Sequence, residues 1–434
     1  MDEKKILEGI RVLSLEQVMS LPYGTAFLAD MGAEVIRIES PEHFNDRRFG
    51  IYPDNKQGEE WWNESATFAN WNRNKKSLCL DVYAPRGREL FLELVEHSDI
   101  VCDNFRTGTM QRLDLDYEHL VKVKPDIISF TCNAYGSTGP YKSLGARARN
   151  IDSFSGLSYL SGYEGGPSLR VSGNYMDHTS GLNNAYLLLN AIYHRKRTGQ
   201  GLRVDASMYE AGIQCVAPAI LEAQRGFFEM RHGSGDRAWR APYNVYPCRP
   251  ADRWIAISVT TDAQWEQLKQ AMGSPNWAAE ERFDTASGRW WDRRELDALL
   301  SAWTLGQQYS DLMEVLQASG VPAGAVYDAQ DCAEDAHLNA RGYFDVFPAA
   351  KAETASGRAI AGRKFAGRPF RVPFVPTPIG PAPDFGANNR ELLQGLLGVT
   401  DTEYAQLETE GTVRSRPAPK ELANRPSATR AGGA

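Results

Sequence analysis

Short runs of apolar residues alternate with helical patterns along the first part of the chain. The runs are rich in Val, Ile and Leu, as buried strands are, and the segments between them repeat their apolar positions every three or four residues. We predict strands at 10–15, 34–39, 77–81, 99–103 and 125–131, and helices at 25–31, 85–97 and 109–113. Strands that alternate with helices form a parallel sheet, so the pattern predicts a doubly wound α/β fold.

A longer helical pattern follows at residues 178–196. Its apolar positions predict one face that packs against the rest of the protein, namely Leu182, Ala185, Tyr186, Leu189 and Ile192. A Gly-containing segment at 198–201 ends this helix. We predict a strand at 202–206 and a further helix at 207–223 after it.

The pattern changes beyond residue 225. A polar stretch at 225–245 precedes a smaller α+β unit, for which we predict a strand at 254–259, a strand after Pro322 and helices at 263–272, 294–303 and 308–319. Residues 346–385 are rich in Pro and Gly and alternate apolar positions, and a late helix is expected at 390–397. The residues from Arg414 onward have no periodicity, which is typical of a disordered tail.

Composition narrows the class of protein. The 434 residues include 48 basic and 55 acidic side chains, which give a net charge of −7 and argue against a nucleic-acid partner. No run of 18 apolar residues is present, so we expect no membrane span. The six cysteines lie far apart, and Cys79, Cys102 and Cys132 fall in apolar runs. This usage predicts reduced core thiols and a cytoplasmic protein.

Several well-known catalytic motifs are missing. The turn after the first predicted strand has no Gly-x-Gly-x-x-Gly pattern, so Glu39, which stands where an NAD-binding protein holds the ribose, does not indicate a dinucleotide site. The chain also has no P-loop, no His-Glu-x-x-His and no Gly-x-Ser-x-Gly. The sequence therefore gives no support to a P-loop nucleotidase, a zinc protease or a serine hydrolase.

Seven short polar signatures occur in order along residues 7–412. They are LADMGAEVIRIE (28–39), NRNKKSLCLD (72–81), DNFRTG (103–108), YGSTGPY (135–141), YMDHTSG (175–181), RTGQG (197–201) and SGVPA (319–323). The ordered set resembles the family III CoA-transferases, the CaiB/BaiF group that includes formyl-CoA and carnitine CoA-transferases.

This resemblance implies a large Rossmann-like domain built from both chain ends and a smaller central α+β domain. We place the large, CoA-binding domain at 1–225 and 346–413, the small domain with its linkers at 226–345, and the tail at 414–434. The resemblance also implies an interlocked homodimer. The expected partners are an acyl-CoA, with coenzyme A as a substrate, and a carboxylic acid, without a metal or prosthetic group.

The nucleophile of the family is an aspartate four residues before a glycine that opens a long helix, which here is Asp177, with Gly181 after it. The resemblance implies that this carboxylate attacks an acyl-CoA thioester and forms a mixed anhydride. Asp177 also fits a helix N-cap, and a helix N-terminus favours the ionised carboxylate that a nucleophile needs. Because a thiolate leaves easily, no strong general acid is required.

The resemblance also suggests the residues that contact CoA. It implies that the nucleotide lies near Leu80, Asn104, Phe105 and Arg112, where the arginine could pair with a phosphate. The pantetheine is expected near Met19 and Ser20. Lys75 is a further candidate, and the loop with Arg147 and Arg149 is expected close to CoA, where either arginine could hold a substrate carboxylate.

Three alternatives stay open at this stage. The related α-methylacyl-CoA racemases have a histidine eight residues before a Ser-Gly-Leu, but that position here is Arg147, so the racemase base is absent. A non-catalytic subunit of a hetero-oligomeric transferase would bind without turnover, and the presence of Asp177 argues against it. A CoA-binding scaffold has little support in the sequence. We therefore expect an acyl-CoA:carboxylate CoA-transferase.

Overall fold

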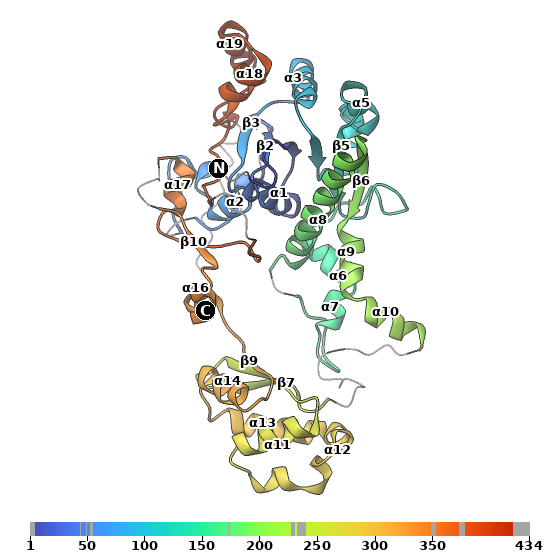
Figure 1. Ribbon diagram of the computed structural model, residues 1–434, viewed down its shortest axis with the longest axis vertical. Coiled ribbons are helices and arrows are strands. Elements are labelled where there is room, and N and C mark those ends of the chain that lie inside the picture. Colours follow the sequence, from blue (N-terminus) through green and yellow to red (C-terminus); the bar gives the residue numbers. More distant parts are fainter. Residues whose placement is uncertain are drawn as a thin grey trace. The chain divides into compact units, whose positions relative to one another are not determined.

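The structure, a computed structural model, describes residues 5–43, 45–48, 50–52, 55–171, 173–226, 231, 240–348, 353–372 and 378–419. The chain divides into two compact units, which Figure 1 shows coloured along the sequence. Unit 1 contains Met1–Ser155, Ser172–Cys215 and His337–Ala434, and unit 2 contains Gly156–Val171 and Val216–Ala336. These units differ from the expected domains in three segments. Unit 2 also contains residues 156–171 and 216–225, which were expected in the large domain, and unit 1 also contains residues 337–345, which were expected in the small domain.

Unit 1 is built on a parallel sheet. Its strands in the described part of the chain are β1 (Arg11–Leu15), β2 (Glu34–Glu39), β3 (Lys76–Cys79), β4 (Ile100–Asp103), β5 (Ile128–Asn133) and β6 (Leu202–Ser207). They lie in the order β3-β2-β1-β4-β5-β6, and every neighbouring pair is parallel. This is the Rossmann order, which reverses between β1 and β4. The α/β fold class predicted from the sequence is confirmed.

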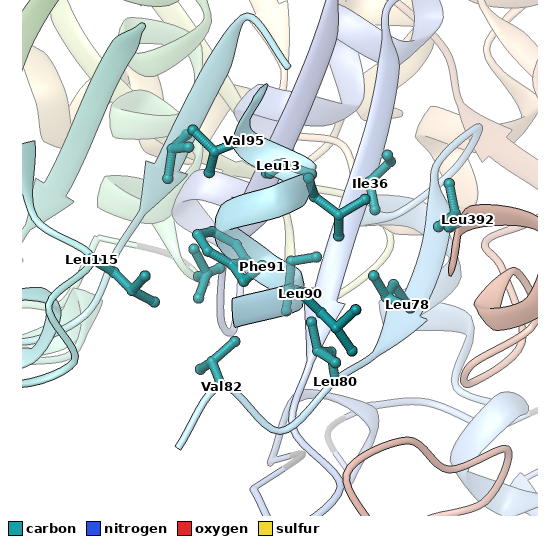
Figure 2. Packing of buried hydrophobic residues seen from close by; sticks show 14 of the residues in the cluster. Leu13, Ile36, Leu78, Leu80, Val82, Leu90, Phe91, Val95, Leu115 and Leu392 are labelled. Carbon is teal, nitrogen blue, oxygen red and sulfur yellow. The ribbon is translucent and has the colours of Figure 1, made fainter. Parts of the chain in front are cut away.

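Helices cover both faces of this sheet. On one face lie α1 (Ser20–Asp30) and α8 (Tyr175–Thr198), and on the other lie α3 (Pro85–Glu96), α4 (Thr109–Arg112), α5 (Tyr117–Val123), α18 (Asn389–Leu397) and α19 (Asp401–Glu410). Side chains alternate between the faces, so Val12 packs with α1 and α8, whereas Leu13 packs with Leu90 and Phe91 of α3 (Figure 2). Two hydrophobic cores therefore hold the sheet from opposite sides.

Shorter elements complete unit 1. They are α2 (Ala66–Trp71), α6 (Ala148–Phe154), α9 (Met208–Cys215), α16 (Ala336–Ala340), α17 (Ala355–Ile360), the antiparallel pair of β10 (Phe344–Val346) and β11 (Lys364–Ala366), and the 3₁₀ turns η1 (Asn45–Arg48) and η3 (Trp61–Asn63). The buried thiols of Cys79, Cys102 and Cys132 are free, as the apolar runs around them predict. In the described residues, no helix is both long and apolar enough to cross a membrane.

The C-terminal segment belongs to the core of unit 1. Leu392 and Leu393 of α18 and Leu407 of α19 are buried in the cluster around α3, and Val413 forms a bridge with Leu80. Six residues of the expected tail, 414–419, are described, and among them Ala418 is buried and its N–H donates to the Pro41 carbonyl. The remainder of that expected tail, 420–434, lies outside the described residues.

Unit 2 is an α+β unit around a small antiparallel sheet. Its strands lie in the order β7-β8-β9 (Tyr243–Cys248, Arg253–Ser258, Ala323–Ala325). Its helices are α7 (Leu157–Leu160), α10 (Ala217–Gln224), α11 (Asp262–Ala271), α12 (Ala286–Trp291), α13 (Arg293–Thr304), α14 (Tyr309–Ala318) and α15 (Ala329–Glu334), with η4 (Asn276–Ala279) and η5 (Glu281–Phe283). Trp265 and Phe283 are fully buried in its core.

Several predicted boundaries were wrong for identifiable reasons. The first helix begins at Ser20 rather than residue 25, because Pro22 is tolerated in a first turn, where no N–H is needed. The predicted helix at 207–223 is two helices that break at Val216, just before Pro218. Strand β7 was missed because it contains Pro247, and β7 lies at the edge of its sheet, where proline is allowed.

The buried face of α8 also differs from the prediction. Leu182, Tyr186 and Leu189 are 44%, 63% and 42% exposed, and the residues that pack inside are mostly small, namely Gly181, Asn184, Ala185, Leu188 and Ala191. The cause is close contact with α1. A Cβ atom added to Gly24 would lie 2.7 Å from the Gly181 carbonyl oxygen. The two helices approach so closely that large side chains cannot fit between them.

Candidate active site

Two loops meet at the carboxyl ends of β1 and β4, where the strand order reverses. The side chain of Asn104, just after β4, accepts a hydrogen bond from the Gln17 N–H and donates one to the Gln17 carbonyl, both at 2.7 Å. This pair joins the loop after β1 to the loop after β4. Ligands of open α/β sheets bind in the crevice at such a reversal point.

On one side of this pair lies cavity A, with a volume of about 880 Å³. Its lining includes all four residues predicted to contact the nucleotide: Leu80, Asn104, Phe105 and Arg112. The Arg112 guanidinium donates to the Thr109 hydroxyl and is solvent-exposed, so it is accessible to an anion. His43 and Tyr83 form a further wall, where their rings pack edge to face.

On the other side lies cavity B, of about 790 Å³, which also includes Gln17 and Asn104 in its lining. The shared pair makes the two cavities neighbours. Cavity B brings together residues from three separate parts of unit 1 that the sequence singled out: Met19, Ser20, Arg147, Arg149 and Asp177. Gln17, Trp71 and Cys132 line it as well and were not predicted.

Asp177 occupies the third position of α8, after the N-cap residue Asn174. The predicted N-cap role for Asp177 is therefore wrong, although the carboxylate does lie in the first turn of the helix. Burial and, to a smaller extent, the carboxylate charge of Asp152 together raise the pKa of Asp177 to about 7. Burial and the charge of Asp152 thus oppose the expected effect of the helix N-terminus, which favours the ionised carboxylate.

His178, the next residue, has a packing role. Its ring lies edge-on to Tyr23 at 4.9 Å and to Trp71 at 6.4 Å between centroids. Its Nδ1 lies 3.0 Å from the carbonyl oxygen of Asn174, one helical turn earlier. No histidine is among the described residues that line cavity B. The described lining of the cavity therefore offers no histidine that could act as the base expected of a racemase.

Lys75 lies in a different environment from the one expected for a CoA contact. Its ammonium group is buried and bonds to the Glu16 carboxylate, the Pro22 carbonyl and the Asn72 side chain. Burial lowers the pKa of Lys75 to about 8, although Glu16 opposes this shift. All three donors of the Lys75 ammonium group are therefore used inside the protein. Through Glu16, Lys75 contacts the loop after β1.

The loop after β1 is held in an unusual conformation. Val18 has a φ of +61°, in the left-handed region that β-branched residues rarely occupy. Its N–H bonds to the carboxylate of Asp46, which in turn pairs with the buried guanidinium of Arg37. Together with the Gln17–Asn104 pair, these contacts fix the backbone that leads into α1, whose first residues line cavity B.

Sequence reasoning missed Asp152, Gln17 and Trp71 because each carries no motif. Asp152 lies on α6, a short polar helix without an apolar repeat. Gln17 could have been found from its position, since it lies in the turn after the first strand, where doubly wound sheets often bind ligands. Among the described residues, no group of three or more His, Cys, Asp or Glu side chains is arranged to hold a metal ion.

The chain is similar to known proteins over most of its length. The family model of CoA-transferase family III matches residues 7–389. Succinyl-CoA–D-citramalate CoA-transferase of Chloroflexus aurantiacus is 31% identical over 94% of this chain and 98% of its own length. The beta subunit of succinyl-CoA–L-malate CoA-transferase of the same organism is 28% identical over the same shares. A CaiB/BaiF family protein of Brucella suis has a similar structure, with a TM-score of 0.79 and 26% identity over 91% of this chain and all of that one.

Proposed function

Because the chain belongs to CoA-transferase family III, we propose that it transfers CoA from an acyl-CoA thioester to a free dicarboxylic acid through a mixed anhydride on Asp177. The observation that carries this proposal is the presence of Asp177 in a cavity that adjoins a second cavity at the Gln17–Asn104 pair. A CoA thioester needs both spaces, one for its nucleotide and one for its acyl group.

The first step joins Asp177 to the acyl group. The Asp177 carboxylate attacks the thioester carbonyl, the C–S bond breaks, and the CoA thiolate leaves with the electron pair. The negative oxygen that forms during the attack needs hydrogen-bond donors. Met19 and Ser20 begin α1 in the same cavity, and the first N–H groups of a helix have no partner within the helix, so we assign this role to them.

The second step exchanges the acid. The incoming carboxylate attacks the aspartyl carbonyl of the anhydride and releases the donor acid. The CoA thiolate then attacks the new acyl group, which forms the product thioester and restores the Asp177 carboxylate. No net proton is consumed in this cycle, which fits a site where none of the described lining residues of cavity B is a histidine.

A dicarboxylic acceptor fits the charges of cavity B. One carboxylate of the acid reacts at Asp177, and a second can pair with Arg147 or Arg149, which line the same cavity. The relative from Chloroflexus is named for succinyl-CoA and D-citramalate, a donor acid and an acceptor with two carboxylates each. Arg149→Gln should raise the KM for succinate or malate and change the KM for a monocarboxylic acid less.

The first test is mass spectrometry of the protein after incubation with a panel of acyl-CoAs and trapping with hydroxylamine. We expect a mass change on the peptide that contains Asp177, and no change in Asp177→Asn, which keeps the side-chain size. An adduct at another residue would contradict the assignment of the nucleophile. Exchange of the α-proton with deuterated water, without an adduct, would indicate a racemase instead.

The proposed CoA position has its own test. Arg112→Ala removes a charged hydrogen-bond donor from cavity A, which should cost about 1.5–3 kcal/mol of binding, or a rise of about 10- to 150-fold in the KM for acyl-CoA. The value of kcat should change little. An unchanged KM for acyl-CoA would show that Arg112 does not contact CoA.

A homodimer is the proposed assembly. Leu182, Tyr186, Leu189 and Tyr193 form an apolar stripe on α8 that is 42% to 63% exposed within one chain. Such a stripe is typical of a surface that a second subunit covers. Sedimentation of the purified protein should give a dimer mass, and Tyr186→Glu should weaken the association.

A subunit of a hetero-oligomer is the second candidate, because one relative is named as a beta subunit. The two assemblies differ in one simple observation. A homodimer should turn over succinyl-CoA and an acceptor acid when purified alone, whereas a hetero-oligomer subunit would need the addition of its partner.

A further inference from the structure

Helix α2 contributes a wall of cavity B that was not expected from the sequence. Thr67 and Trp71 lie one helical turn apart on α2, and both line the cavity together with Asp177. The Trp71 ring packs edge-on against His178, with 6.4 Å between the ring centroids, and His178 directly follows Asp177 on α8. The indole therefore lies close to the candidate nucleophile, in the part of the cavity that would receive an acyl group.

The backbone that follows Trp71 is fixed by two buried side chains. Asn72 is 0% exposed, and its side-chain oxygen accepts a hydrogen bond from the Arg37 guanidinium at 2.9 Å. The Arg73 guanidinium pairs with the buried carboxylate of Asp30 at 2.8 Å. A shift of this segment would separate buried polar and charged groups from these partners, which is costly. The end of α2 is therefore held in place.

The side chains of this wall are held as well. The His178 ring contacts both Trp71 and Tyr23 of α1, so the indole belongs to a group of three rings from three helices. The Thr67 hydroxyl accepts a hydrogen bond from the Ile51 N–H at 3.2 Å, which ties the other end of the wall to the preceding loop. Side chains packed in this way respond to an oversized group with strain.

Space in cavity B is limited. Its volume of about 790 Å³ lies within the range of about 300–1,000 Å³ that is typical of a site for one small ligand. In the proposed reaction the cavity holds the end of the pantetheine, the acyl group and the acceptor acid. Trp71 is the largest side chain among the described residues that line it, and the one aromatic residue among them. A longer acyl group on Asp177 therefore competes with the indole for space.

We propose that Trp71 is a specificity-determining residue that limits the length of the acyl group in cavity B, so that short dicarboxylic acyl groups such as succinyl fit and longer ones do not. This inference deepens the proposed function and rests on it, since it places the acyl group at Asp177. A rigid wall beside the reacting atoms discriminates by exclusion. One extra methylene group that meets such a wall lowers kcat/KM by about 10-fold or more.

The test compares succinyl-, glutaryl- and adipyl-CoA, which differ by single methylene groups, as donors to malate. In the full-length wild-type protein, kcat/KM should fall about 10-fold with each added methylene group, whereas in Trp71→Ala it should fall about 3-fold. The ratio of kcat/KM for adipyl-CoA to that for succinyl-CoA should therefore rise about 10-fold in the variant. An unchanged ratio would overturn the proposal, because selection of length by Arg147 or Arg149 would persist in Trp71→Ala.

Trp291→Ala is the matched control, since it removes the same side chain from a position on α12 that is 69% exposed and does not line cavity B. It should leave the ratio unchanged, and an equal change in the control would overturn the proposal. A purely structural role for Trp71 would lower kcat/KM equally for the three donors. If Trp71→Ala does not fold, Trp71→Phe, which removes only part of the indole, should raise the ratio by a smaller factor; an unchanged ratio there would overturn the proposal as well.

A binding measurement separates this proposal from the proposed function. Asp177→Asn lacks the carboxylate that forms the anhydride, so calorimetric titration with the same three acyl-CoAs reports only how they fit. The Kd should rise about 10-fold per methylene group in Asp177→Asn and about 3-fold when Trp71→Ala is added. If this difference is found but the wild type forms no acyl adduct, the length limit is supported and the nucleophile assignment fails. If the adduct forms but both proteins show the same dependence on length, Trp71 does not set the limit.

Discussion

At the scale of single residues, Asp177 illustrates how environment overrides position. A carboxylate in the first turn of a helix is ordinarily stabilised in its charged form by up to about 1 kcal/mol. Burial and the proximity of Asp152 act in the opposite direction and raise the pKa of Asp177 to about 7. Sequence spacing identified this residue, but its proton affinity depends on neighbours that are remote in the chain.

This raised pKa predicts a stability that depends on pH. The folded state holds the Asp177 proton more tightly than the unfolded chain, so stability falls as pH rises from about 4 to 7 and the penalty is complete above 7. At about 1.4 kcal/mol per pKa unit, the ionised group costs a few kcal/mol. Asp177→Asn should therefore be more stable than wild type at pH 8, and urea titrations should show this difference shrinking as the pH falls to 5. A constant difference would contradict the raised pKa.

Adjacent lysines show the same dependence on environment. Lys75 is buried in an ion pair with Glu16, whereas Lys76 is partly exposed and pairs with Glu34 and Glu391. Lys75→Met leaves the buried Glu16 charge without this partner and should cost about 3–5 kcal/mol of unfolding free energy. Lys76→Met, the control, should cost about 1 kcal/mol or less. A Lys75→Met protein that is as stable as wild type but has a raised KM for acyl-CoA would indicate that Lys75 contacts CoA.

At the scale of elements, the contact of α1 with α8 positions Asp177 relative to Ser20. The hydrophobic repeat of α8 suggested that its large side chains face the sheet, yet Gly181, Ala185 and Ala191 do so. Small residues let the helix backbones come close enough for the first turns of both helices to line cavity B. The large side chains are left outside, where the proposed second subunit would cover them.

This close packing can be tested with one methyl group. Gly24→Ala would place a Cβ 2.7 Å from the Gly181 carbonyl, and such overpacking costs about 1–3 kcal/mol and should also lower kcat, because α1 and α8 both carry site residues. Gly395→Ala on α18 is the control, since no atom lies within 4 Å of its added Cβ. The control should be neutral or more stable by about 0.5–1 kcal/mol. Thermal unfolding and steady-state kinetics check both variants.

At the scale of the whole molecule, the sheet depends on residues far along the chain. Tyr404 and Leu407 pack in the same core as α3, and the Asp81 N–H donates to the Thr412 carbonyl. The Arg47 guanidinium donates to the Pro383 carbonyl across 336 positions. Unit 1 is therefore one body made from both chain ends, with unit 2 inserted between them.

A truncated chain tests this dependence. A protein that ends at residue 336 loses α18 and α19 and exposes the cluster that they cover, so we expect no cooperative thermal transition for its sheet domain. A protein that ends at residue 419 retains both helices and should unfold at the temperature of the full chain. Circular dichroism and limited proteolysis distinguish the two. A short form that unfolds cooperatively near the wild-type temperature would contradict the argument.

The sequence determined the parts of this protein that depend on local order. Alternation of apolar runs with helical repeats is enough to predict a parallel sheet, since each strand and helix has its own period. The order of the polar signatures was enough to predict the family, which the family model confirms over residues 7–389. The same resemblance named Asp177 and four of the residues that line cavity A, namely Leu80, Asn104, Phe105 and Arg112.

Only the tertiary structure decided which side chains meet. Asp152 lies beside Asp177, Gln17 pairs with Asn104, and Lys75 lies beneath the loop after β1 because separate segments converge at the reversal of the strand order. Burial and the distance between charges set the proton affinity of each group, and neither quantity is a property of a residue or of its neighbours in sequence. The charge state of the candidate nucleophile therefore became visible only once the chain was folded.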